Sequence, residues 1–343
     1  MRNLHRTGVA IFLLAMLAPA AVQLFSARAE VSAAEKRALE PMPAWPKGRG
    51  EWSALPAGLD RFVRDHFGLR EPLATGWSLL KYALRYTPRV AVGREGWLYF
   101  PQYWDAKYGT RGCGTLSAGL RALAGRVDRL AARAAESGVT VVFAIAPDKE
   151  TIYPEYMPAD SGAVGCDLYT ALMAALQRTK TVDLRAALGA AKAAEQVYFR
   201  TDSHWNDIGG WRAARVLLEG ACAPGPDCAR LPEPRLATQT LGGDLAGLIG
   251  LASLKAERYV AVDVPRTRRA GRRLVVVGDS FAKSIVRFIA AGESVGEAGF
   301  IDHAEGRVDL PPIVASKPDV LMIVVVERYL YDRDFLRSFA AGF

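Results

Sequence analysis

The sequence predicts an α/β domain with a central parallel sheet flanked by helices. Three segments, Val139–Ala146, Arg273–Val277 and Val320–Val326, are almost uniformly apolar, which is typical of strands that are buried on both faces of a parallel sheet. Segments with helical periodicity lie between them. The chain has 343 residues, of which 50% are hydrophobic and 23% charged, so it has enough apolar material for a sizeable core and is not a disordered chain.

The elements are predicted in a regular order along the chain. A helix at 116–137, with apolar residues at helical spacing and Gly138 at its end, leads directly into the strand Val139–Ala146. The other predicted elements are two short amphipathic helices near 58–67 and 73–85, a helix at about 167–178, short strands near 181–184 and 196–199, a helix that begins near Asp207 behind Asn206 as its N-cap, the strand Arg273–Val277, a helix at 281–290 and the strand Val320–Val326. Residues 219–256 are rich in Pro and Gly and are predicted to be irregular.

The N-terminus has the pattern of an export signal. Arg2 and Arg6 precede an apolar run from Gly8 to Phe25, and the Ala27-Arg28-Ala29 sequence has the form of a signal-peptidase site. The run is long for a cleaved signal and short for a membrane span. In either case the arginines stay on the cytoplasmic side, and the bulk of the protein is predicted to be exported.

This pattern divides the chain into three parts. Residues 1–29 are predicted to be a signal peptide or a membrane anchor, which would attach the protein to the inner membrane if it is not cleaved. Residues 30–57 contain four prolines and are predicted to be a linker, and residues 58–343 are predicted to be one domain.

The formal charge of +8 does not indicate a nucleic-acid-binding protein. Residues 1–29 contain three arginines and no acidic residue, so removing them leaves 8 − 3 = +5. These charges are scattered, and no basic run is interleaved with aromatic residues. Nucleic acid is therefore excluded as a partner, whereas an anionic substrate or a membrane surface fits the charge.

The four cysteines agree with export. Cys113, Cys166, Cys222 and Cys228 form an even set, which in an oxidising compartment favours two disulfides. Cys222–Cys228 would close a Pro/Gly-rich turn and Cys113–Cys166 would join two loops, although three pairings are possible in principle. A zinc site is the alternative, but the sequence has no CxxC and no histidine at ligand spacing, so no metal is predicted.

Polar residues follow each of the three apolar strands: APDK at 146–149, GDSF at 278–281 and ERY at 327–329. Ligands of open α/β sheets bind at the carboxyl ends of the strands, so these segments mark one edge as a candidate site. Ser280 would stand at the first turn of the following helix, where free N–H groups and the helix dipole favour an oxyanion. The alternative is an ordinary strand-to-helix turn that serine caps.

His204 is the best candidate for the base that a serine nucleophile needs. Asp202 precedes it by two residues, which in an extended chain places both side chains on the same side. The carboxylate can then fix one ring nitrogen and leave the other to accept the proton of Ser280. A purely structural histidine is the alternative, and Asn206 is interpreted mainly as a helix cap and only weakly as an oxyanion donor. The other histidines lie in less suitable places: His5, His66 and His303.

The GDSF motif with a separate Asp/His pair resembles the SGNH (GDSL-type) hydrolase superfamily. The order differs from the usual one, because here the Asp/His pair precedes GDS by about 75 residues. That order is similar to the alginate O-acetyltransferase, AlgJ/AlgX-like family. Six motifs carry the similarity: GREGWLYF (93–100), APDKETIYPEYMP (146–158), TDSHWNDIGG (201–210), GGDLAGL (242–248), VVGDSF (276–281) and VVVERYL (324–330).

The resemblance implies a periplasmic SGNH-hydrolase-like domain that O-acetylates an exopolysaccharide, with Ser280, His204 and Asp202 as its catalytic triad. It also implies a membrane-bound acyltransferase of the MBOAT class as the acetyl donor and no cofactor. AlgX-type members carry an additional carbohydrate-binding module. This chain ends about a dozen residues after the ERY segment, so it is expected to be AlgJ-like.

Three further residues are candidates for binding the polysaccharide. Lys149 and Arg328 follow neighbouring strands and could hold an anionic or hydroxyl-rich glycan, while Trp205 could stack on a sugar ring. Each has a structural alternative: an ion pair, such as Lys149 with Glu150 or Glu327, and a core position for Trp205.

Two other functions remain open on the sequence alone. The same triad could pass its acetyl group to water, which would make the protein an exported carbohydrate acetylesterase. The chain could also be a non-catalytic scaffold of a polysaccharide export complex.

Overall fold

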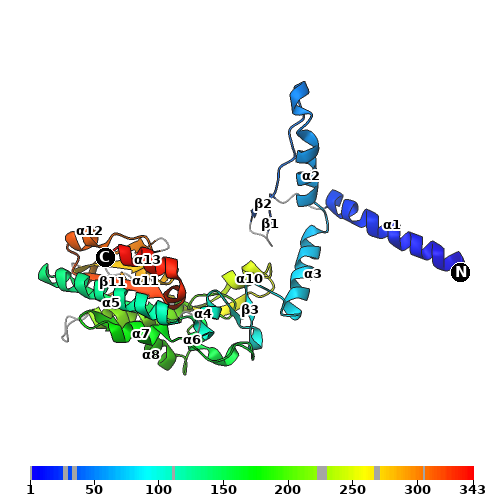
Figure 1. The fold of residues 1–343 in the computed structure, drawn as a ribbon. Coiled ribbons are helices and arrows are strands. Elements are labelled where there is room, and N and C mark those ends of the chain that lie inside the picture. The colour runs from blue at the N-terminus through cyan, green and yellow to red at the C-terminus, as the bar shows by residue number, and fades with distance from the viewer. Residues whose placement is uncertain are drawn as a thin grey trace. The chain divides into compact units, whose positions relative to one another are not determined.

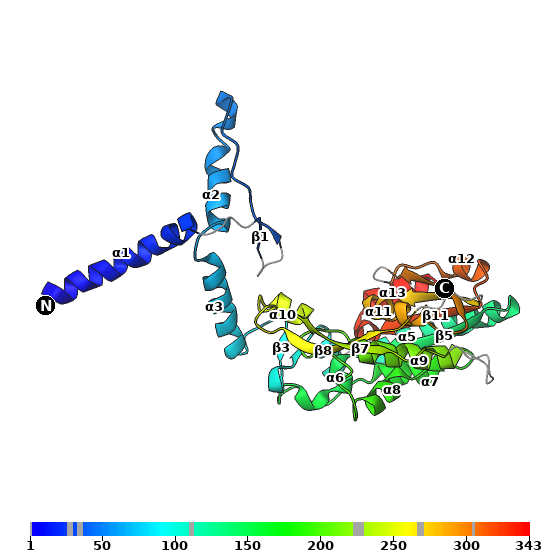
Figure 2. The ribbon, with the colours of Figure 1, turned by 180° about the vertical axis from the view of Figure 1, so that it is seen from behind.

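The chain forms two compact units. In the computed structural model, which describes residues 2–25, 30–32, 37–109, 113–221, 230–265, 271–303 and 306–343, one unit consists of Met1–Pro88 and Ala246–Lys255 and the other of Arg89–Leu245 and Ala256–Phe343. Figures 1 and 2 show the ribbon from two opposite sides. The proposed Cys222–Cys228 pair lies outside the described residues.

The first unit is mainly helical. Its elements are α1 (Arg2–Phe25), β1 (Val31–Ser32), β2 (Arg37–Ala38), the 3₁₀ helix η1 (Arg49–Glu51), α2 (Leu55–Asp65) and α3 (Arg70–Ala83). The helices α2 and α3 correspond to the predicted pair near 58–67 and 73–85 and begin about three residues earlier. Across the described part of the chain, no helix meets both the length and the apolarity that a bilayer crossing demands.

A parallel sheet forms the centre of the second unit and confirms the predicted fold class. Within the described residues it has five strands in the order β10-β9-β11-β5-β6, and every neighbouring pair is parallel. The strands are β5 (Thr140–Ala146), β6 (Lys180–Val182), β9 (Arg272–Gly278), β10 (Val295–Asp302) and β11 (Val320–Val326). The central strand β11 has the predicted bounds, and all seven of its residues are buried.

Helices cover both faces of this sheet because alternate residues of each strand point to opposite sides. Val142 and Met322 pack in one cluster with α8, α9 and α11, whereas Phe143 and Ile323 pack in the other with α5, α7 and α13. The helices are α4 (Trp104–Tyr108), α5 (Cys113–Glu136), α6 (Lys149–Ile152), α7 (Leu168–Ala175), α8 (Leu184–Ala191), α9 (Asp207–Ala221), α11 (Ser280–Ile289), α12 (Leu310–Ala315) and α13 (Arg333–Ala341).

Two sequence predictions of local structure were wrong, and one strand of the sheet was missed. The segment 219–256 is not irregular throughout: α9 continues to Ala221, β7 (Arg235–Leu241) pairs with β8 (Glu257–Asp263), and α10 spans Asp244–Leu248. The strand expected near 196–199 is only an isolated bridge between Tyr198 and Trp205. The edge strand β10 was missed because two glycines and an exposed acidic residue obscure its apolar pattern.

The second unit also contains five short elements: β3 (Ala91–Val92), β4 (Leu98–Tyr99), η2 (Arg94–Gly96), η3 (Pro154–Tyr156) and η4 (Glu327–Tyr331).

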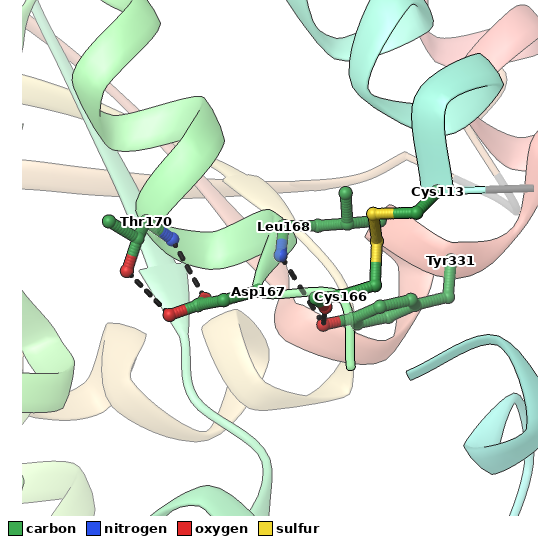
Figure 3. Close-up of a disulfide and its surroundings, with 6 residues drawn as sticks. All are labelled: Cys113, Cys166, Asp167, Leu168, Thr170 and Tyr331. Atoms are coloured by element: carbon green, nitrogen blue, oxygen red, sulfur yellow. Dashed lines mark hydrogen bonds between the residues drawn. A yellow bond between two sulfur atoms is a disulfide. The ribbon is translucent and has the colours of Figure 1, made fainter. Parts of the chain in front are cut away.

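The predicted Cys113–Cys166 disulfide is present (Figure 3). It joins the start of α5 to the loop before α7, two segments that are 53 residues apart. The Tyr331 hydroxyl donates to the carbonyl of Cys166 at 2.7 Å and so fixes the same loop. A disulfide that closes a long loop restricts the unfolded chain, and such bonds persist in oxidising compartments.

Asp167, beside this disulfide, is expected to make stability depend on pH at the acidic end. It accepts hydrogen bonds from the Thr170 amide at 3.0 Å and the Thr170 hydroxyl at 2.7 Å, and it pairs with Arg185 at 3.0 Å. Burial acts to raise the pKa of Asp167, but the hydrogen bonds from Arg185 and Thr170 prevail and lower it to about 2. Since this value lies below that of an unfolded Asp, the stabilisation is present above about pH 4 and disappears as the pH falls towards 2.

Asp167→Asn is therefore expected to reduce the free energy of unfolding by about 1 kcal/mol at pH 6, a modest figure because both side chains of the pair are partly exposed. At a pH of about 2.5 the two proteins should differ much less. Urea titrations at both pH values measure this difference. An equal loss at both values would show that the charge of Asp167 does not contribute.

Candidate active site

The three polar segments that follow the apolar strands meet at one edge of the sheet, as expected for neighbouring parallel strands. β9 ends at Gly278 and α11 begins at Ser280. A side chain at Gly278 would place its Cβ 2.3 Å from Ala282 Cβ and 2.6 Å from the Val324 carbonyl, so this turn requires glycine.

Asp279, rather than Ser280, is the N-cap of α11. Its Oδ1 accepts the Phe281 amide at 2.8 Å, and its Oδ2 accepts the Val326 amide at 2.9 Å. The carboxylate thereby satisfies the helix start and ties β9 to the end of β11. The simple alternative of a capping serine is wrong, and the hydroxyl of Ser280 is available for chemistry at the exposed first residue of the helix.

Ser280, His204 and Asp202 lie in one hydrogen-bonded row. Ser280 Oγ lies 2.8 Å from His204 Nε2, and His204 Nδ1 lies 2.7 Å from Asp202 Oδ1. The Asp202 side chain is 13% exposed and that of His204 29%. Burial acts to raise the pKa of Asp202, but the hydrogen bonds from His204 and from the Asp244 amide prevail and keep it below its usual value. An ionised carboxylate therefore holds one ring nitrogen while the other contacts the serine.

The loop that carries Asp202 and His204 is fixed by the buried Lys149 and the partly exposed Glu257. Lys149 Nζ donates to the carbonyls of Phe199 and Arg200, both at 3.1 Å, and to that of Asp202 at 2.6 Å. Glu257 accepts from the amides of Arg200 and Thr201 at 2.9 and 2.7 Å. Lys149 thus donates hydrogen bonds to carbonyl groups of this loop, and Glu257 accepts hydrogen bonds from its amide groups.

This position does not suit Lys149 for binding a glycan. Its side chain is 2% exposed, and burial lowers its pKa to about 7. Three carbonyl acceptors match the three N–H groups of the ammonium form. The expectation that Lys149 holds the polysaccharide is therefore corrected, as is the alternative of an ion pair with Glu150 or Glu327, because its donors are directed at loop carbonyls.

Trp205 is also a structural residue. It is 3% exposed, its indole N–H donates to Ser284 Oγ at 2.6 Å, and its ring packs edge-on against Phe281 at 5.0 Å. Trp205 therefore occupies a core position, which was the alternative interpretation. A side chain this buried cannot stack on a sugar ring, so the expectation of a sugar contact is corrected.

Arg328 occupies an intermediate position near the nucleophile. Its guanidinium lies over the Phe281 ring at 5.2 Å, and its Nε lies 3.1 Å from Asp148 Oδ1. The side chain is 12% exposed. A role for Arg328 in binding substrate remains a proposal.

Asn206 serves as a cap. Its Oδ1 accepts the Gly209 amide at 3.0 Å at the start of α9, and its Nδ2 donates to the Gln196 carbonyl at 2.6 Å. Both polar atoms are thus occupied, which confirms the cap and speaks against an oxyanion role.

A buried ionic cluster around Lys107 was not predicted from the sequence. Lys107 is 3% exposed, and its Nζ lies 3.1 Å from Glu327 and 3.3 Å from Glu150. Burial acts to lower the pKa of Lys107, but Glu150, Glu327 and Asp148 raise it well above its usual value. Glu327 also accepts the Asp148 amide at 2.9 Å and so joins the ends of β5 and β11. Even the partner closest in sequence, Asp148, lies about forty residues from Lys107, so a local sequence pattern could not predict the cluster.

Asp244 is a further residue of the site that the sequence analysis missed as a functional group, although its GGDLAGL segment was noted. Ligand atoms of Asp202, His204 and Asp244 lie within 4.8 Å of one another, a spacing that a metal ion could also use. In the structure these atoms are hydrogen-bonded to one another and to the loop. The expectation that the protein needs no metal stays a prediction, which assays with a chelator would test.

Comparison with known proteins assigns the family. Residues 90–288, more than half of the chain, match the family described as SGNH hydrolase-like domain, acetyltransferase AlgX. The chain belongs to this family. The match includes Ser280, His204 and Asp202.

Relatives from several Pseudomonas species carry the name "Probable alginate O-acetylase AlgJ". That of P. syringae pv. tomato is 30% identical over 173 residues, which cover 49% of this chain and 42% of the relative. That of P. aeruginosa is 27% identical over 309 residues, which cover 77% of each chain. The first match thus spans less than half of the relative's length.

A solved structure supports the fold of this AlgX-type domain. The O-acetyltransferase domain of P. putida AlgJ superposes with a TM-score of 0.51 and 23% identity, covering 75% of this chain and all of that one. Together with the family match, this likeness agrees with the SGNH-hydrolase-like fold that the resemblance implied.

Proposed function

We propose that this chain is an O-acetyltransferase that moves an acetyl group through Ser280 onto hydroxyl groups of an exopolysaccharide in the periplasm. The observation that carries the proposal is the row from exposed Ser280 through His204 to Asp202, with contacts of 2.8 and 2.7 Å. Membership of the AlgX-type family and the names of the Pseudomonas relatives support acetyl transfer to a polysaccharide.

In the first half of the reaction, His204 Nε2 takes the proton of Ser280, and Ser280 Oγ attacks the carbonyl carbon of an acetyl ester. The Ser280 amide, at the start of the ten-residue helix α11, stabilises the tetrahedral oxyanion. The bond to the donor oxygen then breaks, that oxygen receives the proton from His204, and acetyl-Ser280 remains. Ionised Asp202 stabilises the imidazolium that forms transiently.

In the second half, a sugar hydroxyl gives its proton to His204 and attacks the acetyl carbon of acetyl-Ser280. Collapse of the second tetrahedral intermediate breaks the Ser280 ester bond and returns the proton from His204 to Ser280 Oγ. The products are an acetylated sugar and the free enzyme, so no cofactor is consumed.

The proposed setting is the periplasmic side of the inner membrane. The Cys113–Cys166 disulfide and the export signal predicted for residues 1–29 support it. Since acetyl groups originate in the cytoplasm, we propose a membrane-bound acyltransferase of the MBOAT class as the partner that delivers them.

Acetyl transfer to a glycan tests the proposal. The full chain, in detergent micelles, is incubated with a chromogenic acetyl ester and with either alginate or neutral oligosaccharides. We expect acetylated oligosaccharide, identified by mass spectrometry, and a chromophore release that increases with acceptor concentration.

Two outcomes would contradict the proposal. Acetate release that does not respond to any oligosaccharide, together with loss of acetate from acetylated polymer, would indicate the esterase. No turnover with any acceptor, combined with a loss of polymer export on deletion of the protein, would indicate the scaffold.

A further inference from the structure

A second carboxylate lies beside the Asp202–His204 pair. Asp244, the first residue of α10, accepts the Ser203 amide through Oδ1 and the Ser203 hydroxyl through Oδ2, both at 2.6 Å. Its Oδ2 is 3.6 Å from His204 Nδ1, and the Ser203 hydroxyl is 3.3 Å from the same nitrogen. Asp244 therefore reaches the imidazole both directly, through its charge, and through one intervening hydroxyl.

The backbone of Asp244 holds the other member of the pair. Its amide donates to Asp202 Oδ2 at 2.8 Å, while Asp202 Oδ1 faces the His204 ring and accepts the His204 amide at 3.0 Å. Both oxygens of Asp202 are thus engaged, and the carboxylate cannot rotate away from His204 without losing a hydrogen bond.

Gly243 permits this close approach. A Cβ on Gly243 would lie 2.2 Å from the Thr201 carbonyl oxygen and 2.5 Å from the Asp202 amide nitrogen. Any side chain there would separate the Asp244 segment from the loop that carries the pair. The contact is therefore built into the backbone rather than made by a mobile surface side chain.

We infer that Asp244 is a positioning residue of the acetyl-transfer reaction, which together with Ser203 orients His204 and supplies a second negative charge to its protonated form. The inference rests on the proposed function. It assigns the GGD segment (242–244) a role in orienting the base His204, a role that no member of the triad provides.

The surroundings of His204 make the effect of this charge measurable. Among the described residues, the titratable groups that face the ring are Asp202 and Asp244. The Ser280 hydroxyl contacts the ring at 2.8 Å, and the uncharged ring of Phe281 packs on it at 4.8 Å. Lys149 and Glu257 reach the same loop through its backbone. The Asp244 side chain is 42% exposed.

Asp244→Asn tests the inference, because it removes the charge and keeps an acceptor for the Ser203 amide. We expect kcat to fall about tenfold with KM changed less than about twofold, since the lost charge acts on the transition state. The acid limb of the kcat/KM profile should move to lower pH, by up to about one unit, because one of two anions that favour the protonated ring is gone. In the double variant Asp202→Asn/Asp244→Asn, the factor by which kcat falls should exceed the product of the factors for the two single variants.

Glu257→Gln is the matched control, because Glu257 anchors the same loop through Arg200 and Thr201. It should lower the melting temperature and kcat while leaving the acid limb in place. The inference is overturned if Asp244→Asn has the kcat and acid limb of the wild type, or if it behaves like Glu257→Gln.

Covalent modification separates this inference from the proposed function. With phenylmethylsulfonyl fluoride, the Ser280 Oγ–S bond forms, the S–F bond breaks, fluoride leaves, and His204 takes the serine proton. The rate requires no acetyl donor or glycan, and Asp244→Asn should slow it with the same shift of the acid limb. If the wild type is modified but transfers no acetyl group, the proposed function fails, and what stands is the role of Asp244 in orienting His204 for the attack by Ser280. A wild type that is not modified at all overturns both.

Discussion

Replacement of Ser280 by alanine is expected to abolish acetyl transfer, with a fall in kcat/KM on the order of 10⁴-fold or more. The alanine keeps the backbone amide and the start of α11 but removes the atom that carries the acetyl group. Asp279 caps the helix, so the fold should be unaffected. Steady-state kinetics with the chromogenic ester, at equal melting temperatures, measure the effect.

The other members of the row sharpen this prediction. His204→Ala should cost a similar factor, and the double variant Ser280→Ala/His204→Ala should be no worse than either alone, because the two act as a unit. Ser316→Ala, which removes a surface hydroxyl at the end of α12, is the control and should keep wild-type kinetics. A Ser280→Ala protein that retains transfer within about tenfold of the wild type would remove this serine from the mechanism.

Lys149→Met is expected to destabilise the protein by about 3 kcal/mol or more and to lower kcat about 100-fold. The change leaves the carbonyls of Phe199, Arg200 and Asp202 without their shared donor in a buried position. The loop that holds the Asp202–His204 pair would then lose its geometry relative to Ser280. Urea unfolding and steady-state kinetics measure the two effects.

The same variant discriminates between two roles of Lys149. A loop anchor predicts lower stability and lower kcat with little change in KM. A glycan ligand predicts higher KM for the acceptor with unchanged stability. Lys283→Met, on the exposed side of α11, controls for the loss of a positive charge and should leave both properties as in the wild type.

The parts of the fold that were predictable from sequence are those with dense local signals. β11 has the predicted bounds because its seven residues are apolar and buried on both faces. β7 was missed for the opposite reason. Six of its seven residues are exposed, so burial leaves no alternating pattern in the sequence. Its position is set by pairing with β8, which a local pattern does not contain.

The candidate site follows the same rule. Ser280 and the Asp202–His204 pair were predicted as candidates because each has a short signature, and the fold brings Ser280 and His204 within hydrogen-bonding distance. The contacts of Lys149 and Asp244 were not foreseeable, because their partners lie about 40 to 50 residues away. Whether Trp205 packs in the core or contacts a sugar depends on its burial, and the sequence pattern around an aromatic residue does not determine how much of its ring is buried.

The most direct test of the account is detection of acetyl-Ser280. The full chain is mixed with the chromogenic ester, quenched rapidly and analysed by intact mass and peptide mapping, before and after a chase with oligosaccharide. The account predicts one acetyl group on the peptide that contains Ser280, absent from Ser280→Ala and transferred to the sugar during the chase. Turnover without a Ser280 adduct, or an adduct that oligosaccharide does not discharge, would contradict it.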